Sequence, residues 1–424
     1  MRILWLTGAL LPEATAKIKG EELQQWNTTG SWILGAAAAL TAMDDVELFM
    51  AATSQDVTEL TRIETGRITS YAIPYGKGHF LENRDYDPYM KTIHDEVRPD
   101  IVHIHGTEYS HSLSYLRTCG NRHTVISIQG MTSVVHRYYH DGMTLSDIIK
   151  HISFRDLIRG GVLRDQKTFK KRGAFEQEMI RSVGHIIGRT SWDYAHTKAI
   201  NPHIAYHYGG ETLRNEFYTG KHWSYNGCQP HTIFMSQANV PYKGLHLLLK
   251  ALPIILRSYP DTHVFIAGQD PTLGYQSSQW WRLTGYGRYI KSLIKELGLL
   301  EHVTFIGPKN AEEMKTELLH SNLYLCPSAI ENSPNSLGEA QILGVPCVAA
   351  YVGGIMDMMK GNEENLYRYE DIEMMAEKIC RVFSNKGTQP DLSAVARERH
   401  NPQKNVRDLL ETYHCIMGDA IEMC

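Results

Sequence analysis

Short apolar runs alternate with helical patterns along most of the chain, and this alternation constrains the fold more than any other feature. In the first half the runs are RILWL, VELFMAAT, ITSYAIP, DIVHIHG, HTVISIQG and HIIG. In the second half they are HTIFMSQ, THVFIAGQD, HVTFIGP, NLYLCPS and PCVAAYVGG, separated by helical stretches such as GRYIKSLIKELGLL. Strands that alternate with helices build parallel sheets from βαβ units. The sequence therefore predicts an α/β protein.

A polar segment that is rich in turn-forming residues, KHWSYNGCQP at residues 221–230, separates the two series of runs. The length of 424 residues also exceeds what a single hydrophobic core usually supports. We predict two consecutive Rossmann-like domains, at residues 1–220 and 221–390, and a helical tail at 391–424 that could pack back on either domain, the N-terminal one being the first candidate. Ligands of such folds bind at the carboxyl ends of the strands, so we expect a site in a cleft where the two parallel sheets face each other.

The composition excludes several classes of function. The formal net charge of −4 argues against general nucleic-acid binding, which needs a surplus of Lys and Arg. Seven scattered cysteines without a C-x-x-C pair favour a reducing compartment, and so a cytoplasmic location. The first residues, MRILWLTGALLPEATAKIKG, resemble a secretory signal, but a buried first strand is the preferred interpretation. No apolar stretch reaches the length that a membrane span needs.

Two glutamates, Glu331 and Glu339, stand eight positions apart in IENSPNSLGEAQILGVP. Ser333 as N-cap and Pro334 as the first helical residue predict a helix from 334 to 343 between them. A helix N-terminus offers unpaired N–H groups and partial positive charge, which suit a phosphate. Solvated helices also carry glutamates at this spacing, so the pattern alone leaves a surface role open.

The same stretch places groups for each part of a nucleotide sugar. The amides near Asn335, Ser336 and Leu337 would hold a diphosphate, while Glu339 lies about 8 Å along the helix, within reach of a ribose. Glu331, on the other side of the helix start, would meet the attached sugar. A second turn, SQANVPYKG, puts Lys243 at a helix start after a strand, where an ammonium could reach phosphate oxygens.

These motifs resemble the retaining family-4 glycosyltransferases with the two-domain GT-B fold, of the kind that builds bacterial surface polysaccharides. The matching segments are the E-x7-E motif from Glu331 to Glu339, VGG at 352–354, PDIVHIHGTEYSHSL, GRTSWDYAHTKAINP, PYKG, YIKSLIKELGLLEHVTFIGP and RERHNPQKNVRDLLETYH. The resemblance implies a hexosyl- or acetylhexosaminyl-type transferase. Its donor would be a nucleotide-diphosphate sugar, most often UDP-linked, and its acceptor a hydroxyl of a glycan or a lipid-linked molecule. It implies retention at the anomeric carbon, with no cofactor and no bound metal.

The resemblance also implies roles for residues. Three would be catalytic: Glu331, Lys243 and His105. The donor would be bound by Glu339, Asn335, Ser336, Leu337, Gly30, Ser31, Lys309 and Gln237. The acceptor side would include Gln129 and Arg189.

Two positions depart from the family pattern. Most relatives carry an Arg where this chain has Ala238, and the nearest polar residue, Gln237, is uncharged. Relatives also often carry T-x-H-G where this chain reads SIQG, with Gln129 in place of the His. Glutamine cannot carry a proton at neutral pH, so that role passes to His105 or to the leaving phosphate. A nucleotide-sugar epimerase on the same fold, and a non-catalytic subunit that binds nucleotide sugar, remain alternatives.

A basic segment runs from Lys150 to Arg172, KHISFRDLIRGGVLRDQKTFKKR, with eight Lys or Arg against two Asp. Solvated helices often look like this. The alternative is attachment to the anionic inner face of a membrane, which would suit an enzyme with a lipid-linked acceptor.

Overall fold

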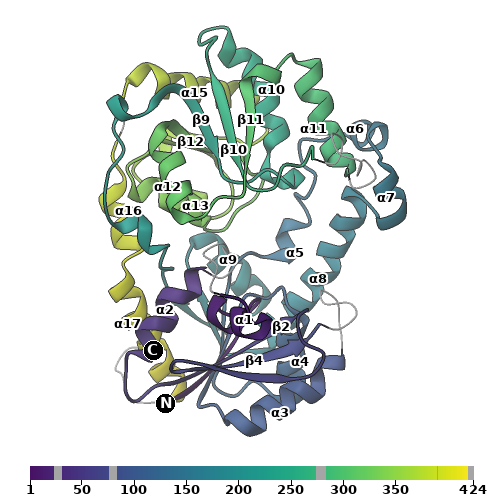
Figure 1. The fold of residues 1–424 in the computed structure, drawn as a ribbon, viewed down its shortest axis with the longest axis vertical. Coiled ribbons are helices and arrows are strands. Elements are labelled where there is room, and N and C mark those ends of the chain that lie inside the picture. The colour runs from purple at the N-terminus through teal and green to yellow at the C-terminus, as the bar shows by residue number, and fades with distance from the viewer. Residues whose placement is uncertain (23–30, 76–83, 274–282, 389, 419–424) are drawn as a thin grey trace. The chain divides into compact units, whose positions relative to one another are not determined.

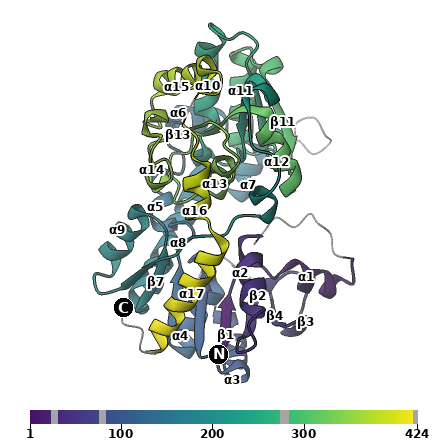
Figure 2. The same cartoon turned by 90° about the vertical axis from the view of Figure 1, so that its left-hand side faces the viewer.

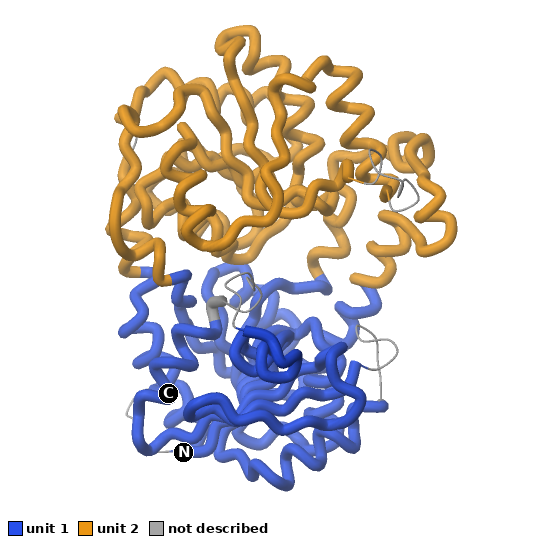
Figure 3. Tube along the Cα trace, in the orientation of Figure 1, with its two compact units in different colours: residues 1–133, 170–214, 399–424 blue, residues 134–169, 215–398 orange. Residues whose placement is uncertain are grey.

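The structure is a computed structural model that describes residues 1–22, 31–75, 84–273, 283–388 and 390–418. The chain divides into two compact units, which Figure 3 colours separately. Unit 1 comprises residues 1–133, 170–214 and 399–424, and unit 2 comprises residues 134–169 and 215–398. Each unit is an α/β layer structure with helices packed on a sheet (Figure 1).

The sheet of unit 1 has the strand order β3-β4-β2-β1-β5-β6-β7-β8. All neighbours pair in parallel except β3 and β4, which are antiparallel. The strands are β1 (Arg2–Leu6), β2 (Glu47–Ser54), β3 (Thr61–Thr65), β4 (Ile68–Pro74), β5 (Ile101–His105), β6 (Thr124–Ser127), β7 (His185–Gly188) and β8 (Ala205–Tyr208).

Two of these strands were not expected from the sequence. Strand β3 buries only Ile63, and β8 has no fully buried residue, so neither carries the apolar run that marks an inner strand. Both lie at the edges of the sheet, where one side has no neighbouring strand. The six predicted runs of the first half all form strands.

The helices of unit 1 connect these strands and cover the sheet. They are α1 (Pro12–Lys19), α2 (Ser31–Thr41), α3 (Asp87–Val97), α4 (Ser110–Cys119), α9 (Ser191–Ile200) and α17 (Pro402–Met417), with α8 (Val162–Ser182) continuing from unit 2. The C-terminal α17 packs against α2 and β5, as Figures 1 and 2 show. Its Tyr413 and Ile416 enter the same core cluster as Ile3 and Trp5 of β1.

Unit 2 has a six-stranded parallel sheet in the order β11-β10-β9-β12-β13-β14. The strands are β9 (Gln229–Met235), β10 (His263–Ala267), β11 (Val303–Gly307), β12 (Ser321–Cys326), β13 (Cys347–Ala350) and β14 (Leu366–Tyr367). The helices are α5 (Thr132–Val135, at the unit boundary), α6 (Leu145–Lys150), α7 (Phe154–Arg159), α10 (Leu245–Leu256), α11 (Gly285–Glu296), α12 (Ala311–His320), α13 (Asn335–Ile342), α14 (Ile355–Met358), α15 (Ile372–Asn385) and α16 (Ser393–Arg399).

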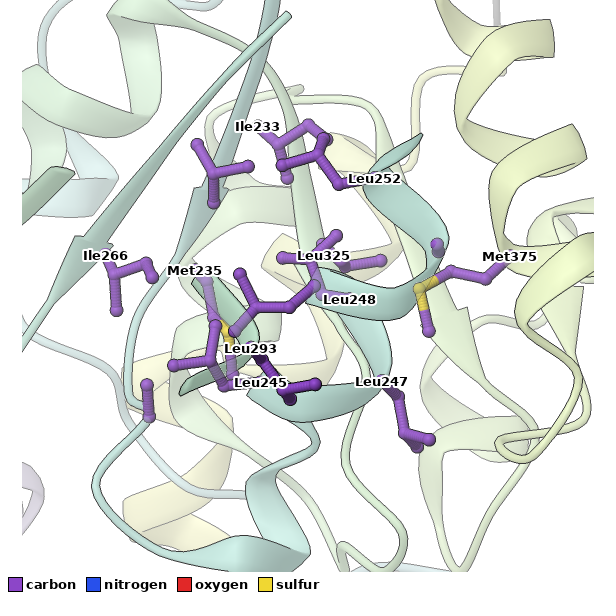
Figure 4. Close-up of a cluster of buried hydrophobic side chains, with 14 of the residues drawn as sticks. Ile233, Met235, Leu245, Leu247, Leu248, Leu252, Ile266, Leu293, Leu325 and Met375 are labelled. Atoms are coloured by element: carbon purple, nitrogen blue, oxygen red, sulfur yellow. The ribbon is translucent and has the colours of Figure 1, made fainter. Parts of the chain in front are cut away.

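The core of unit 2 lies between this sheet and helices α10, α11 and α15. Figure 4 shows side chains from α10, such as Leu248 and Leu252, among those of the strands and of α15. Residues 134–169 belong to this unit because Tyr139, Met143, Ile148 and Val162 are buried in the same cluster. Residues 134–169, in the first half of the chain, therefore group with unit 2. The prediction had included them in the N-terminal domain, at residues 1–220.

Candidate functional site

The lysine turn follows the carboxyl end of β9. A single 3-10 turn, Pro241–Lys243, leads through Gly244 into α10. Gly244 has a φ of 79°, and a Cβ there would lie 2.0 Å from the Pro327 carbonyl oxygen. Glycine is therefore needed both for the left-handed conformation and for the close approach. The approach brings the lysine turn against the loop that follows β12, where the Ala329 N–H donates to the Tyr242 carbonyl at 2.8 Å.

Lys243 and Glu331 form an ion pair in this position. The Lys243 Nζ donates to the Glu331 Oε1 at 2.5 Å, and both side chains are largely buried. The Ser328 hydroxyl donates to the same oxygen at 2.8 Å. Burial alone would lower the pKa of Lys243, but the Glu331 carboxylate raises it above its ordinary value, so the ammonium stays charged. The two residues predicted to be catalytic in the second domain are therefore in direct contact.

The VGG segment fixes the backbone at Glu331. A Cβ on Gly353, whose φ is 52°, would lie 1.8 Å from the Glu331 carbonyl oxygen. The next amide, that of Gly354, donates to this carbonyl at 3.1 Å. The glycines therefore allow the loop after β13 to touch the Glu331 loop, which explains why the two motifs occur together.

Helix α13 begins one residue later than predicted. Its N-cap is Pro334, with φ −69° and ψ 120°, so Ser333 lies outside the helix and the expectation that Ser333 caps it was wrong. The proline ring fixes φ at a value that suits either the cap or the first turn, and here the extended ψ makes it the cap. Because proline has no side-chain acceptor, no side chain caps the helix, and its first turn keeps the positive end of the dipole uncapped.

The first turn of α13 lies beside the ends of β9 and β12. The Ser336 hydroxyl accepts from the Ser236 hydroxyl at 3.0 Å and lies 2.8 Å from the Tyr324 hydroxyl. The side chain of Leu337 is fully buried, and its N–H donates to the Pro334 carbonyl at 3.0 Å, so the expectation that its amide holds a diphosphate is not supported. Glu339 is buried one turn further along, with 3% exposure. The helix therefore carries the predicted donor-binding residues next to the Lys243–Glu331 pair.

The other predicted donor-binding residues are more dispersed. Gln237 is exposed in the turn after β9, and Lys309 follows β11 with its Nζ 3.6 Å from the Glu317 Oε1. Ala238, the position that departs from the expected family pattern, is fully buried in the core of unit 2. Ser31 is the first residue of α2 in unit 1, and Gly30 lies outside the described residues.

In unit 1 the structure brings three predicted residues to one cavity of about 70 Å³. His105 ends β5, Gln129 follows β6 and Arg189 follows β7, so all three come from the carboxyl ends of neighbouring strands. The cavity is closed on another side by residues of α17, including Asn405 and Thr412. The sequence predicted the three strand ends, but it did not predict that the C-terminal helix α17 also lines the cavity.

His105 is held by its neighbours on the sheet. Its ring stacks on that of His103 at a centroid distance of 3.8 Å. His103 in turn contacts the Tyr413 hydroxyl and the Ser127 hydroxyl, each at 2.6 Å, and Trp5 Nε1 donates to the same tyrosine at 3.0 Å. Burial lowers the pKa of His103 to about 3 and holds that of His105 well below its usual range, so both rings are neutral near pH 7.

Arg189 forms a buried ion pair that the sequence did not reveal. Its Nη1 lies 2.9 Å from the Glu211 Oε2, and both side chains are at most 10% exposed. The Glu211 carbonyl accepts from His400 Nδ1 at 2.7 Å. Glu211 lies in the loop after β8, and because β8 carries no apolar run, no strand signal drew attention to this loop.

Two further carboxylates in unit 1 were also missed. Glu176 of α8 is fully buried and accepts from the Thr107 hydroxyl at 2.8 Å and from the Thr132 and Ser133 amides at 2.9 and 3.0 Å. Burial, and then the Glu176 carboxylate, raise the pKa of Glu108 to about 7. Its position three residues after His105, just past a strand end, was the signal that could have identified Glu108.

Over the residues that the structure describes, no three His, Cys, Asp or Glu side chains gather in a way that could hold a metal ion. Nor does any helix among them have the length and apolarity to cross a membrane.

Part of the chain is similar in sequence to known proteins. Residues 227–399 match the family model of the glycosyl transferases group 1. A D-inositol 3-phosphate glycosyltransferase of Mycobacterium marinum is 30% identical over 189 residues, which are 42% of this chain and 39% of that protein. A similar enzyme of Corynebacterium urealyticum is 25% identical over 180 residues. The chain thus spans about two fifths of the length of these curated relatives.

Solved structures match over almost the whole chain. The sucrose-phosphate synthase of Thermosynechococcus elongatus superposes with a TM-score of 0.68 at 15% identity, covering 99% of each chain. At such low identity the likeness defines the fold, which is that of the GT-B glycosyltransferases with two parallel-sheet domains. The α/β class and the GT-B fold are therefore confirmed.

Proposed function

We propose that this chain is a retaining glycosyltransferase that moves a sugar from a UDP-linked donor to a hydroxyl of a glycan or a lipid-linked acceptor. The proposal extends to a role in the synthesis of cell-surface polysaccharide, on the cytoplasmic side of the membrane. The observation that carries it is the contact of Lys243 with Glu331 beside the uncapped start of α13. A cation, a carboxylate and a helix N-terminus without a side-chain cap, all at the ends of parallel strands, suit a sugar diphosphate.

The donor would bind in unit 2. Its diphosphate would accept from the first-turn amides of α13 and from Lys243, and its ribose hydroxyls would donate to the buried Glu339. Glu331 would face the transferred sugar, whose ring gains positive charge as the bond to phosphate stretches. We propose that no metal takes part, because the ammonium and the helix dipole supply the positive charge. A solved structure of HepE from Anabaena with the same fold is a complex with UDP, which supports the choice of nucleotide.

The acceptor would bind in unit 1. The cavity beside His105 is lined by groups that recognise hydroxyls, among them Gln129, Arg189 and Glu211. His105 is neutral near pH 7, so it could accept a hydrogen bond from a hydroxyl. The resemblance of the E-x7-E motif to that of the retaining family-4 glycosyltransferases supports retention, in which the leaving phosphate itself would take the acceptor proton.

Product analysis tests this function. A panel of UDP-, GDP- and ADP-linked sugars is first screened for thermal stabilisation of the full chain, and the best donor is then incubated with glycosidic and lipid-linked acceptors. We expect a UDP-sugar to stabilise most and the product to keep the donor's α configuration in the NMR spectrum. Inversion would contradict the proposal. Conversion of the donor alone into an epimer would instead assign epimerase activity, and donor binding without turnover would assign a non-catalytic subunit.

A further inference from the structure

One short segment of unit 2 exposes large apolar side chains on two successive helices. On α6, Leu145 and Ile149 are four residues apart and share a face, and on α7, Phe154, Leu157 and Ile158 follow the same helical spacing. Each of these five side chains is more than half exposed. We call this surface the α6–α7 face. An exposed apolar surface of this kind is typical of an interaction site.

The α6–α7 face is presented by a rigid support. Both helices begin with a capping box, Thr144 with Asp147 and Ser153 with Asp156. Six-residue helices are unstable alone, so tertiary contacts must hold them. Figure 1 shows the pair beside α11, against which α6 packs. The apolar side chains are therefore held outward, and cannot simply turn into the core.

The contacts with α11 are specific. The Arg288 guanidinium donates to the Ile152 carbonyl at 2.6 Å, and the His151 ring lies 5.2 Å from that of Tyr289. A Cβ at Gly285 would come within 2.3 Å of the Asp156 Oδ2. Ile148, on the inner side of α6, is buried in the core of unit 2. The inner side of the two helices is therefore in contact with the rest of unit 2, whereas the large apolar side chains on their outer side are exposed.

Basic side chains flank the α6–α7 face. Arg159 at the end of α7, and Arg164 and Lys167 on the first turns of α8, are all exposed. The acidic residues of the two helices, Asp147 and Asp156, are engaged in the capping boxes. With the exposed Asp165 between Arg164 and Lys167 included, the border still carries a net positive charge, although the chain as a whole is acidic.

We propose that the α6–α7 face docks on an anionic lipid bilayer, with Leu157 and Ile158 inserted between the headgroups and the flanking Arg and Lys bound to lipid phosphates. Amphipathic helices with this combination lie in the membrane interface and gain affinity from both apolar burial and charge. A second copy of the chain is a poorer occupant, because two such faces would bring like charges together. The inference does not rest on transferase activity.

Co-sedimentation of the full chain with vesicles tests the proposal without donor or acceptor. We expect binding to vesicles of phosphatidylcholine with phosphatidylglycerol. The double substitution of Leu157→Ser and Ile158→Ser should weaken partitioning at least about tenfold, because two large apolar side chains no longer leave water. The matched control is Leu300→Ser, which removes an equally exposed leucine elsewhere on unit 2 and should leave binding unchanged. All these side chains are exposed, so circular dichroism should show an unchanged fold.

A second pair of substitutions separates charge from insertion. Arg159→Gln with Lys167→Gln should abolish the preference for anionic over neutral vesicles, whereas Lys221→Gln with Lys360→Gln should not. Added salt should reduce binding only in part, because the apolar contribution is not screened. Wild-type protein that ignores anionic vesicles, or a Leu157→Ser and Ile158→Ser variant that binds as wild type, would overturn the proposal. So would a wild-type dimer that this variant dissociates while vesicle binding stays the same.

Discussion

The Lys243 ammonium lies 2.5 Å from the Glu331 carboxylate, although 88 positions separate the two residues in the chain. Their contact joins the turn after β9 to the loop after β12, and these strands are neighbours in the sheet of unit 2. Each charge partly cancels the other. A donor diphosphate would therefore compete with Glu331 for the ammonium, and a positively charged transition state would compete with Lys243 for the carboxylate.

Glu331→Gln should separate donor binding from turnover. The substitution removes the carboxylate that faces the reacting sugar, so we expect kcat to fall roughly 10²–10³-fold. It also releases Lys243, so UDP should bind at least as tightly as to wild type. Steady-state kinetics and calorimetry with UDP check the two parts. Normal turnover with weakened UDP binding would show that the two roles are assigned the wrong way round.

Glu339→Ala should mainly raise the donor KM. The ribose does not change during transfer, so the loss of its partner weakens substrate and transition state alike. The matched control is Glu373→Ala on the exposed surface of α15, which should leave KM unchanged. A lower kcat at an unchanged KM would place Glu339 near the reacting bond instead of the ribose.

Tyr413→Phe should destabilise unit 1 by about 1–3 kcal/mol, because the buried His103 and Trp5 lose the hydroxyl that they share. Urea denaturation measures the change. Tyr208→Phe serves as the control, since Tyr208 is largely exposed. Equal stability of the Tyr413→Phe variant and wild type would show that the hydroxyl does not hold α17 on the sheet.

Glu108→Gln should stabilise the protein in a pH-dependent manner. Folding raises the pKa of Glu108 from 4.5 to about 7, so the folded chain holds this proton more tightly than the unfolded chain does. The associated stability is present at low pH and is lost as the pH rises through about 7. The variant should therefore melt higher than wild type at about pH 8 and similarly at about pH 5. A melting difference that is the same at both pH values would rule out Glu108 as the titrating group.

The sequence predicted those parts of the fold that depend on local periodicity. Every apolar run that was singled out forms a strand. Most of them are inner strands, which are buried on both faces in a parallel sheet, but β11 is an edge strand without a fully buried residue. The same periodicity placed His105, Gln129 and Arg189 at strand ends, and the sheet order then brought them to one cavity. Sequence spacing also predicted the Lys243 turn and the Glu331 loop separately, but not their direct contact.

Other features depend on contacts between distant segments and could not be read from the sequence. Ile148 and Val162 give no local sign that they belong to the core of unit 2. The Arg189–Glu211 pair depends on the pairing of β7 with the edge strand β8, which has no apolar signature. The cap of α13 was mispredicted because the backbone angle at Pro334, and not residue preference, decides which residue is the cap.

A double variant tests whether Lys243 binds UDP itself or only neutralises the charge of Glu331. Lys243→Ala leaves the Glu331 carboxylate partly buried without its ammonium, which could repel a diphosphate by itself. Combining Lys243→Met with Glu331→Gln removes both charges. We expect UDP affinity to remain low in this double variant, because the cation is still missing. Recovery of wild-type UDP affinity would show that Lys243 only neutralises Glu331 and does not bind UDP itself.

Calorimetric titration of the full chain with UDP in the presence of a chelator tests whether Lys243 and the start of α13 form a nucleotide site that needs no metal. We expect one UDP to bind per chain without divalent metal, and Lys243→Ala to weaken the binding by about 1.5–3 kcal/mol, the range for a charge-assisted hydrogen bond. The control Lys295→Ala, at an exposed position of α11, should bind UDP as wild type does. Binding of UDP that requires added metal, or an affinity that Lys243→Ala leaves unchanged, would show that Lys243 is not part of a metal-independent nucleotide site.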